Sequence, residues 1–346
     1  MSMTQVRPLG GIIPPVITPL RDVDQLDVAA LERLIEHIVA HAVGGLFILG
    51  SCGEAASLTA SLRCEMVRET CRIVAGRVPV LVGITHNVPC ESIQLARFAA
   101  DAGADAVVTS TPSYFKLDQQ ELILHIESLL PELPLPVLLY NIPQLTGVSF
   151  TPETVACLMQ HDCIIGIKDS ASDMSLFHMF IAQAQERSDW TVLMGNELLL
   201  AEAMLFGAHG GVPGGANVIP HVFVQLGEAA QRGDLSAVQA LQELGADFSQ
   251  IYTNGQGGSA IVAAIKCACH ELGLCDQVLA PPLQPLTGEQ QRRIAEVVRR
   301  MTQPIEEPIL SLGSNVQEWL STAGQIRKTA ASAAAVPVSQ TPSRST

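Results

Sequence analysis

Short apolar runs alternate with amphipathic helical stretches through roughly the first two thirds of the chain, and this alternation constrains the fold more than any other feature. The runs are apolar at consecutive positions, which is typical of strands buried on both faces in a parallel sheet. Eight such runs occur, near residue 15 and at residues 44–50, 78–85, 104–111, 136–141, 164–170, 190–196 and 210–216. The pattern therefore predicts a repeated strand–helix unit.

The regions between these runs have the spacing of amphipathic helices, with apolar residues three or four positions apart. Two examples are Leu31, Leu34, Ile35 and Ile38, and Leu122, Ile123, Ile126, Leu129 and Leu130. Residues suited to cap helix starts include Ser61, Asp118 and Thr151. Eight strand–helix units are the number in a closed (β/α)8 barrel, whereas doubly wound open sheets usually have about five to seven strands. We therefore predict an α/β protein with a TIM barrel.

The pattern also divides the chain. The predicted barrel covers residues 1–233. Residues 234–304 continue with helical patterns and no strands, which predicts a C-terminal helical region packed on the barrel. Residues 305–346 are rich in Ala, Ser, Thr and Pro and have little apolar surface to bury, so we expect a mostly disordered tail, with one marginal helix over residues 315–328.

The charge balance and the cysteine count exclude several classes of protein. The chain has 20 basic and 34 acidic side chains, a formal net charge of −14. Nucleic acids and anionic membranes bind cationic surfaces, so neither is an expected partner. No apolar run approaches the ~20 residues that span a bilayer, and the start of the chain lacks the apolar segment of a secretory signal. Nine cysteines, an odd number, indicate reduced thiols in the cytoplasm.

Lys168 is one of only four lysines, and it lies near the end of the apolar run at 164–170. A side chain there points into the barrel or into the helix layer, and both contain little water. Burial disfavours the ammonium form, and a neutral amine attacks carbonyl carbon to form a Schiff base. The competing interpretation is an ion pair with Asp169, but adjacent strand residues point to opposite faces.

Two of the three tyrosines fall at the carboxyl ends of predicted strands. Tyr140 ends the predicted strand before that of Lys168, and Tyr114 follows the strand one earlier. Barrel active sites are built at that end from several strands, and a phenol beside an amine shuttles protons while a carbinolamine forms and collapses. Each tyrosine taken alone is more typical of a structural residue with a satisfied hydroxyl. Their occurrence with a lysine on successive strand ends favours a catalytic set.

A third group lies in the turn after the second predicted strand, where residues 50–54 read GSCGE. Glycines let backbone N–H groups approach a ligand closely, and amides that precede a helix suit a carboxylate. We therefore expect the amides of residues 50–54 to bind a carboxylate. The Ser51 hydroxyl is placed to pass protons between Tyr140 and bulk water.

The segments GSCGE, TPSYF, YNIPQLTG and GIKDS occur in this order, and together they resemble the dihydrodipicolinate synthase / N-acetylneuraminate lyase family. The resemblance covers all of the chain except the tail. It implies a (β/α)8 barrel with a helical C-terminal extension, assembled as a homotetramer of paired dimers. It also implies a class I lyase or aldolase that joins a lysine to pyruvate or another 2-oxo acid as a Schiff base. The enamine then attacks an aldehyde, or the reverse reaction cleaves a carbon–carbon bond. No metal or organic cofactor is implied.

The resemblance also implies a role for each matching residue. Lys168 matches the Schiff-base lysine, and Tyr140 matches the tyrosine that relays protons and binds the substrate. Ser51, Cys52 and Gly53 match the turn that holds the keto-acid carboxylate. The remaining matches are Tyr114, which in the synthases reaches into the neighbouring subunit's relay, and Gly195 and Val212, whose backbones line the pocket.

Several positions depart from the synthase pattern. Cys52 replaces a threonine or serine, and a thiol is a weaker hydrogen-bond donor. Leu145 replaces the arginine that in the synthases holds the carboxylate of aspartate semialdehyde, and leucine makes no such contact. A leucine at this position instead resembles the pattern of the neuraminate lyase subgroup. Asn196 and Glu197 loosely resemble that subgroup's polyol-binding acidic residues. A role as a true dihydrodipicolinate synthase is therefore not expected.

The synthases' site for feedback inhibition by lysine is incomplete in this chain. Arg63 and Ser113 replace the histidine and tyrosine that the resemblance leads one to expect there. We predict that free lysine does not inhibit the enzyme, because two of the contacts that would hold it are missing. Turnover measured across a lysine titration checks this prediction, and clear inhibition at micromolar lysine would contradict it.

Other interpretations of the sequence stay open. The same imine serves a dehydratase that expels water from a keto-deoxy sugar acid. A non-catalytic regulator that binds a keto acid in a degenerate pocket is a third alternative. The run GGVPGGAN at residues 210–217 resembles a phosphate cradle. A zinc site is suggested only by Cys267, Cys269, His270 and Cys275, whose spacing fits the packing face of a helix better.

Overall fold

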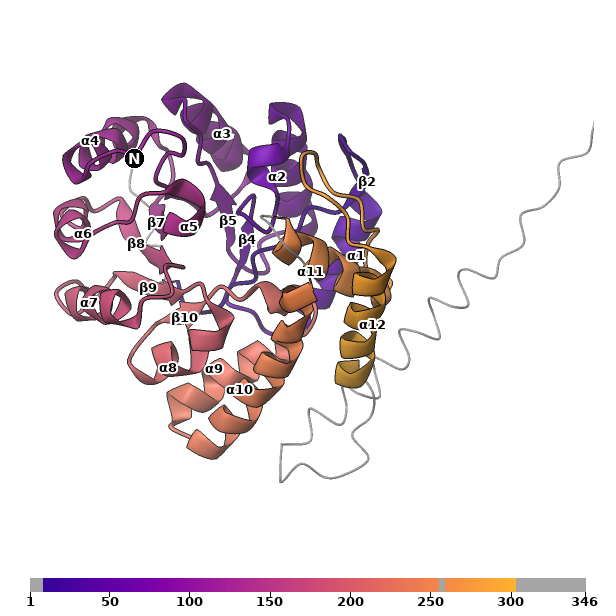
Figure 1. Ribbon diagram of the computed structural model, residues 1–346. Helices are drawn as coiled ribbons and strands as arrows, with labels where there is room; N and C mark the ends of the chain where they lie inside the picture. The colour runs from indigo at the N-terminus through magenta and orange to yellow at the C-terminus, as the bar shows by residue number, and fades with distance from the viewer. Residues whose placement is uncertain (1–8, 255–258, 303–346) are drawn as a thin grey trace, which may run out of the picture.

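The computed structural model describes residues 9–254 and 259–302, and its centre is a ring of eight parallel strands (Figure 1). The strands are hydrogen-bonded in the order β1-β10-β9-β8-β7-β6-β5-β4. They are β1 (Gly11–Ile12), β4 (Leu46–Ile48), β5 (Val80–Gly83), β6 (Ala106–Ser110), β7 (Val137–Asn141), β8 (Ile164–Asp169), β9 (Thr191–Met194) and β10 (Gly210–Gly211). A separate hairpin joins β2 (Leu20–Asp22) and β3 (Gln25–Leu26).

The two edges of this sheet meet and close the ring. Pro15 pairs in parallel with Phe47, which lies on β4. The backbone N–H of Val16 donates to the carbonyl of Phe47 at 2.8 Å, and the N–H of Phe47 donates to the carbonyl of Pro14 at 3.0 Å. The predicted TIM barrel is therefore confirmed.

Helices form the outer layer of the barrel, as the repeated pattern predicts (Figure 1). They are α1 (Val28–Val39), α2 (Ala60–Val74), α3 (Pro89–Ala102), α4 (Gln119–Leu129), α6 (Pro152–Leu158), α7 (Met174–Ala184), α8 (Leu200–Leu205) and α9 (Pro220–Arg232). The short helix α5 (Pro143–Thr146) follows β7 at the carboxyl end of the barrel. Among the described residues, no helix has the length and apolar character that crossing a membrane requires.

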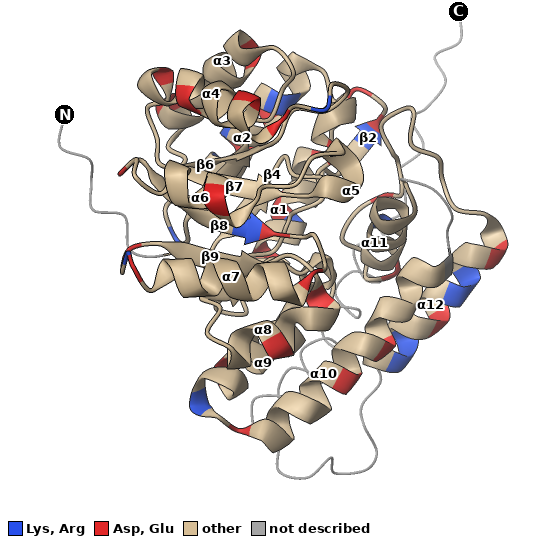
Figure 2. Ribbon diagram, turned by 60° about the vertical axis from the view of Figure 1, so that its left-hand side comes forward, with Lys and Arg blue, Asp and Glu red and all other residues tan. Residues whose placement is uncertain are grey.

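Three further helices extend the fold beyond α9. They are α10 (Leu235–Ser249), α11 (Ala260–Glu271) and α12 (Gly288–Thr302), and a 3-10 helix, η5 (Gln250–Asn254), follows α10. Figure 2 shows α11 beside the barrel with α12 on its outer side, and α12 has both basic and acidic bands along its length. The predicted tail lies outside the described residues.

The structure corrects the sequence analysis at three local points. The apolar run near residue 15 contains no strand of its own, because Pro14 and Pro15 have no N–H to donate, and β1 lies earlier. Only the first two residues of the run at 210–216 are a strand, and residues 214–217 form the 3-10 helix η4 (Gly214–Asn217). Helix α2 is capped by Thr59 rather than Ser61, since the Thr59 hydroxyl accepts from the N–H of Leu62 at 3.3 Å. The predicted caps Asp118 and Thr151 are confirmed.

Two apolar layers hold the barrel together. The larger one lies between the strands and the helices, and the smaller one fills the inside of the ring. The smaller layer comprises Leu9, Ile13, Phe47, Leu81, Ala106, Val108, Leu138, Tyr140, Leu193 and Val212. A side chain at the carboxyl end of a strand that points inward is therefore held on a dry, packed floor.

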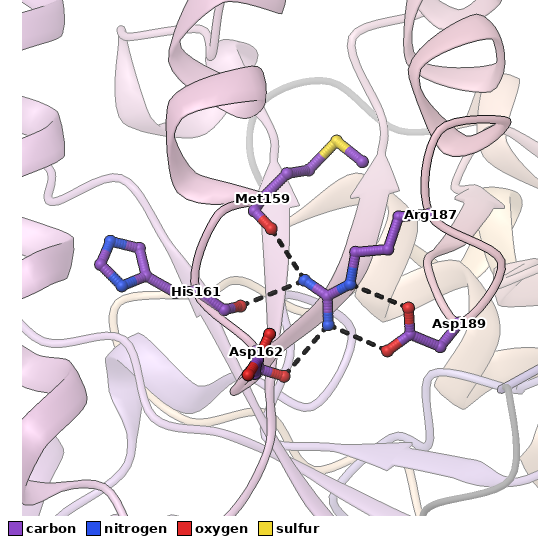
Figure 3. A network of polar contacts seen from close by, with 5 residues as sticks. All are labelled: Met159, His161, Asp162, Arg187 and Asp189. Atoms are coloured by element: carbon purple, nitrogen blue, oxygen red, sulfur yellow. Dashed lines mark hydrogen bonds and ion pairs between the residues drawn. The ribbon is translucent and has the colours of Figure 1, made fainter.

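Arg187 ties the barrel together at the amino-terminal ends of β8 and β9 (Figure 3). Its guanidinium donates to the carbonyls of Met159, His161 and Asp162 at 2.9 to 3.1 Å, and it forms an ion pair with Asp189 at 2.8 Å. This end of a barrel contributes to stability rather than to catalysis. The network therefore acts as a structural clamp between the loops that enter the two strands.

We expect Arg187→Met to lower the free energy of unfolding by ~2 kcal/mol, because several carbonyls lose a charged donor at once. Thermal and denaturant unfolding measure the loss. Arg97→Met is the matched control, since Arg97 only pairs with Glu132 on the surface and such pairs contribute ~0.5 kcal/mol or less. Equal losses in the two variants would contradict the clamp. The folded Arg187→Met protein is expected to keep its full catalytic rate.

Candidate active site

An irregularity in β8 turns Lys168 toward the inside of the barrel. Val137 of β7 pairs with Ile164, but Leu138 pairs with Gly166, so one extra residue lies in β8 between the two pairs. The extra residue shifts the alternation of side chains by one position. Lys168 consequently pairs with Tyr140, whose side chain belongs to the inner layer, and neighbouring partners on parallel strands point to the same face.

Gly166 makes this irregularity possible. A Cβ atom at this position would lie 2.2 Å from the carbonyl oxygen of Thr191, on the next strand. Only a residue without a side chain fits so close to the neighbouring backbone. The glycine two residues before the lysine therefore sets the direction of the lysine side chain.

The Lys168 amine lies against two aromatic rings. Its Nζ atom is 4.0 Å from the ring centroid of Tyr140 and 5.1 Å from that of Phe47. The two rings meet edge to face, with centroids 6.0 Å apart, and the Lys168 side chain is only 3% exposed. The expected position of this amine, in a dry part of the barrel near the carboxyl end of the strands, is what the structure shows.

Asp169 points away from Lys168. Its Oδ1 atom accepts from the side-chain amide of Asn141 at 2.6 Å and from the N–H of Ala171 at 3.3 Å. Burial raises the pKa of Asp169 to about 6, against these two donors, which favour the carboxylate. The competing interpretation, an ion pair with Lys168, finds no support, because the two adjacent side chains lie on opposite faces of β8.

Ser51 meets Tyr140 at the mouth of the barrel. The two hydroxyl oxygens are 3.2 Å apart, and Ser51 is partly exposed, so the pair connects the interior with solvent. The turn that holds Ser51 is compact: the Gly53 carbonyl accepts from the Thr18 hydroxyl at 2.7 Å. The turn leads into a single 3-10 turn, η1 (Ala55–Ser57), and α2 begins three residues later at Ala60.

A buried carboxyl group, that of Glu197, lies against the turn after β10. Glu197 accepts from the N–H of Gly215 at 2.8 Å and from the hydroxyl of Tyr252 at 3.3 Å, both at Oε2. Burial raises the pKa of Glu197 to about 7, against these two donors. Burial also raises the pKa of the Cys52 thiol to about 11, while the charge of Lys168 opposes the shift and that of Glu197 adds to it. Cys52 therefore lies within electrostatic reach of both groups.

Gly195 and Val212 occupy the ends of the next two strands. The N–H of Gly195 donates to the carbonyl of Asp169 at 2.7 Å, and a Cβ atom at Gly195 would lie 1.9 Å from the hydroxyl oxygen of Ser170. Val212 is buried in the inner layer together with Tyr140. These residues form the rim and floor around Lys168.

Two predicted site residues lie on the surface of the single chain. Tyr114 is 88% exposed, has a positive φ of 84° and packs edge to face against Phe115, with ring centroids 5.1 Å apart. Leu145 is 57% exposed and lies on α5. The structure thus brings Lys168, Tyr140 and Ser51 together, and leaves Tyr114 and Leu145 facing outward.

Sequence reasoning assigned no role to Phe47 and Tyr252. Phe47 supports the lysine, and its place in the apolar run at 44–50 was the available signal. Tyr252 comes from η5, 55 positions after its partner Glu197, and no local pattern reveals that contact. Its one signal was the rarity of tyrosine in the chain.

The thiols of helix α11 pack against other parts of the fold. The Cys267 thiol lies 4.0 Å from the carbonyl oxygen of Gln291, and the Cys269 thiol lies 3.8 Å from that of Asn217. The two thiols thus contact different parts of the fold. In residues 9–254 and 259–302, no group of three or more His, Cys, Asp or Glu side chains is arranged to hold a metal ion.

The chain is similar to known proteins over almost all of its described length. A curated 4-hydroxy-tetrahydrodipicolinate synthase of Polynucleobacter asymbioticus is 30% identical over 290 residues, which are 83% of this chain and 93% of that protein. The "Probable 2-dehydro-3-deoxy-D-pentonate aldolase YjhH" of Escherichia coli is 31% identical over 292 residues, 84% of this chain and 96% of that protein.

Solved structures give the same result. The dihydrodipicolinate synthase of Bacteroides thetaiotaomicron is 45% identical with a TM-score of 0.83, and the match covers 86% of this chain and all of that one. YagE, an Escherichia coli prophage protein solved in complex with pyruvate, is 32% identical with a TM-score of 0.80, over 84% and 98% of the two chains. The pattern of the Dihydrodipicolinate synthetase family matches residues 8–301, and the chain belongs to this family of lyases.

Proposed function

We propose that this chain is a class I lyase or aldolase that forms a Schiff base between Lys168 and pyruvate or another 2-oxo acid. The observation that supports the proposal most is the environment of Lys168, a residue that is 3% exposed and whose Nζ atom is 4.0 Å from the ring centroid of Tyr140. The Ser51 hydroxyl lies next to Tyr140 and can relay protons, since the two hydroxyl oxygens are 3.2 Å apart. A nucleophile, a proton donor and a path to solvent are the groups that imine chemistry needs.

In this proposal, the neutral amine of Lys168 attacks the keto carbon of the 2-oxo acid and forms a carbinolamine. Tyr140 donates a proton to the departing hydroxyl, water leaves, and the imine forms. Loss of a proton from the adjacent carbon gives an enamine, whose carbon attacks the aldehyde, and hydrolysis of the product imine restores the amine. Ser51 returns the proton from solvent to Tyr140. The amides of residues 50–53 hold the carboxylate, while the Glu54 N–H donates to the Ser51 carbonyl within the turn. No metal or organic cofactor takes part in any of these steps.

The second substrate is proposed to be a sugar-derived or hydroxylated aldehyde rather than aspartate semialdehyde. Leu145 stands at the position where the resemblance places an arginine in the synthases. A leucine side chain has no donor that could bind a carboxylate. The similarity to a named pentonate aldolase and to a structure solved with pyruvate supports 2-keto-3-deoxy sugar acids as substrates or products. Sialic-acid-like compounds and a hydroxy-oxoglutarate fit the same chemistry.

The proposal extends to the assembly. Tyr114 is 88% exposed in the single chain, and we propose that it completes the relay of a neighbouring subunit in a cytoplasmic homotetramer built from two dimers. Sedimentation of the purified protein measures the assembly. A monomer with full activity would exclude a role for Tyr114 across an interface.

Reductive trapping tests the proposed function. Incubation with pyruvate and borohydride is expected to add the mass of a reduced pyruvate imine to the intact chain, with the added mass on Lys168 after digestion. A panel of other 2-oxo acids extends the test. Failure to trap any of them would favour the non-catalytic regulator. Product analysis separates a lyase, which releases an aldehyde, from the alternative dehydratase, which releases water.

The raised pKa of Glu197 predicts a pH-dependent affinity. The carboxyl is neutral below its pKa of about 7 and charged above it, while the keto-acid carboxylate is charged throughout this range. Repulsion between two carboxylates that share a partly buried site amounts to ~1 kcal/mol. We expect KM for the keto acid to rise ~5- to 10-fold from pH 6 to pH 8.5.

Glu197→Gln removes the titrating group, so KM is expected to stay nearly constant over the same pH range. Glu202→Gln is the matched control, because Glu202 is exposed on the neighbouring helix α8, and it is expected to keep the wild-type pH profile. Steady-state kinetics at constant ionic strength measure both profiles. A rise of KM that persists in Glu197→Gln would assign the pH dependence to another group.

A further inference from the structure

A fully buried ion pair lies directly behind the carboxylate-binding turn. Lys266 Nζ of α11 is 2.5 Å from Glu54 Oε1, and both side chains are 0% exposed. Glu54 is the last residue of the GSCGE turn, and its backbone has a positive φ of 58°. The pair is 212 positions apart in the sequence, so it joins the barrel to the C-terminal helical region.

The pair is embedded in two further directional contacts. Glu54 Oε2 accepts from the N–H of Ala280 at 2.8 Å, and Lys266 Nζ donates to the carbonyl of Val278 at 2.5 Å. Each partner is thus also bound to the segment after α11. The end of the turn, the helix and this segment are fixed relative to one another by directional contacts.

Stability alone is a weak reason for such a pair. Taking two charges out of water costs several kcal/mol, and well-packed apolar residues often stabilise a core equally well. An ion pair with additional hydrogen bonds differs from apolar packing in being directional, because the geometry must be met at each atom. The pair therefore suits a place where position matters.

The position of this turn matters because the turn carries Ser51, which contacts Tyr140. The hydroxyl oxygen of Ser51, three residues before Glu54, is 3.2 Å from the Tyr140 hydroxyl oxygen. Within the turn the backbone hydrogen bonds are long, 3.2 Å from the Glu54 N–H to the Ser51 carbonyl and 3.4 Å from the Ala55 N–H to the Gly50 carbonyl. The turn's own backbone hydrogen bonds are thus weak, and it is anchored from outside by Thr18 at the Gly53 carbonyl and by the contacts of the Glu54 side chain.

Helix α11 also contacts the turn after β10, which lies beside Cys52. A Cβ atom at Gly214 would lie 3.1 Å from Ile265 of α11 and 3.8 Å from the thiol of Cys52. The Cys269 thiol lies 3.8 Å from the carbonyl oxygen of Asn217, the last residue of η4. One helix therefore contacts two turns that border the site, and Figure 2 shows it packed beside the barrel.

We propose that Glu54 and Lys266 are positioning residues that hold the keto-acid-binding turn against α11, so that affinity for the 2-oxo acid depends on the C-terminal helical region. The inference rests on the proposed function, since it concerns the turn that is proposed to bind the keto-acid carboxylate. Neither side chain touches the substrate. Their effect is on the positions of Ser51 and Cys52 and of the backbone amides around them.

The test separates affinity for the keto acid from the capacity to react with it. Full-length wild-type, Lys266→Met, Glu54→Gln and the double variant are titrated with pyruvate in the presence of borohydride, and the adduct on Lys168 is measured by mass. We expect each single variant to raise the half-saturating pyruvate concentration at least 10-fold, with the same adduct level at saturation. The half-saturating concentration of the double variant is expected to be no higher than that of the more affected single variant, because both substitutions act through one contact.

Cys267→Ala is the matched control. It truncates a buried side chain of the same helix on the side that faces Gln291, so it is expected to lower the melting temperature without changing the half-saturating concentration. Glu54→Gln keeps the size of the side chain and an acceptor for the Ala280 N–H, so it remains a test if Lys266→Met does not fold.

Three results would overturn the inference. The first is a half-saturating concentration within twofold of wild type in a folded single variant, which would make the pair purely structural. The second is a double variant whose fold-change is the product of the two single changes. The third is the absence of any adduct in the wild-type protein, which overturns the proposed function itself. It is distinguishable from the other two results because it is measured on the wild-type protein and not on the variants.

Discussion

Replacing Lys168 by methionine is expected to abolish turnover, with kcat reduced on the order of 10⁴-fold or more, ~5.5 kcal/mol of barrier. Methionine has no amine, so neither the carbinolamine nor the imine forms. The fold is expected to survive, because the side chain lies against the rings of Tyr140 and Phe47 in the apolar inner layer of the barrel. A methionine of similar length packs there at a cost or gain of ~1 kcal/mol.

Three measurements check this prediction together. Steady-state turnover measures the loss of activity, thermal unfolding measures the stability, and borohydride trapping with pyruvate is expected to give no adduct. Lys116→Met is the matched control, because Lys116 is exposed on the surface and its loss leaves both turnover and trapping intact. Residual turnover in Lys168→Met, or an adduct on another amine, would show that a different nucleophile carries the reaction.

The strand that carries Lys168 could be predicted from the sequence, whereas the direction of the Lys168 side chain could not. The run at 164–170 predicts the strand, and the structure has it at Ile164–Asp169. Simple alternation from Ile164, which faces the helices, would turn Lys168 toward the helices as well. The extra residue beside Gly166 reverses this. The sequence contains the glycine, but the close approach of Thr191 that requires it exists only in the folded sheet.

Contacts between distant segments were beyond prediction for a similar reason. Tyr252 contacts Glu197, and Lys266 contacts Glu54, although the partners are 55 and 212 positions apart in the sequence. No periodicity relates such positions, because the contacts depend on how the C-terminal helices dock on the barrel. Lys266 lies in an apolar stretch of α11, and nothing in the sequence singles out its partner among 34 acidic side chains.

The first strand was misplaced because hydrophobicity and hydrogen bonding disagree there. The run near residue 15 is apolar and its valine and isoleucines are buried, as expected of a strand. Two adjacent prolines remove two N–H donors, so the strand itself is Gly11–Ile12, and Pro15 makes an isolated bridge to Phe47. Burial was predictable at these positions, while the hydrogen-bonded ladder was not.

Tyr140→Phe is expected to reduce kcat ~10²- to 10³-fold, because it removes one hydroxyl from the relay and leaves the lysine intact. The phenylalanine ring keeps the contact with Lys168 and the edge-to-face contact with Phe47, whose centroid is 6.0 Å away. The lost hydrogen bond to Ser51 costs ~1 kcal/mol of stability. The pyruvate adduct is expected to reach the wild-type level but slowly, since the imine forms without its proton donor.

Ser51→Ala separates a proton relay from simple packing. It removes the next hydroxyl, 3.2 Å from Tyr140, and is expected to reduce kcat ~10-fold, because water replaces it in part. The double variant is expected to be no slower than Tyr140→Phe, since both hydroxyls lie on one path and the effects of residues that act as a unit do not add. Losses that multiply would place Tyr140 and Ser51 on separate paths. A kcat within threefold of wild type in Tyr140→Phe would assign proton transfer to another group.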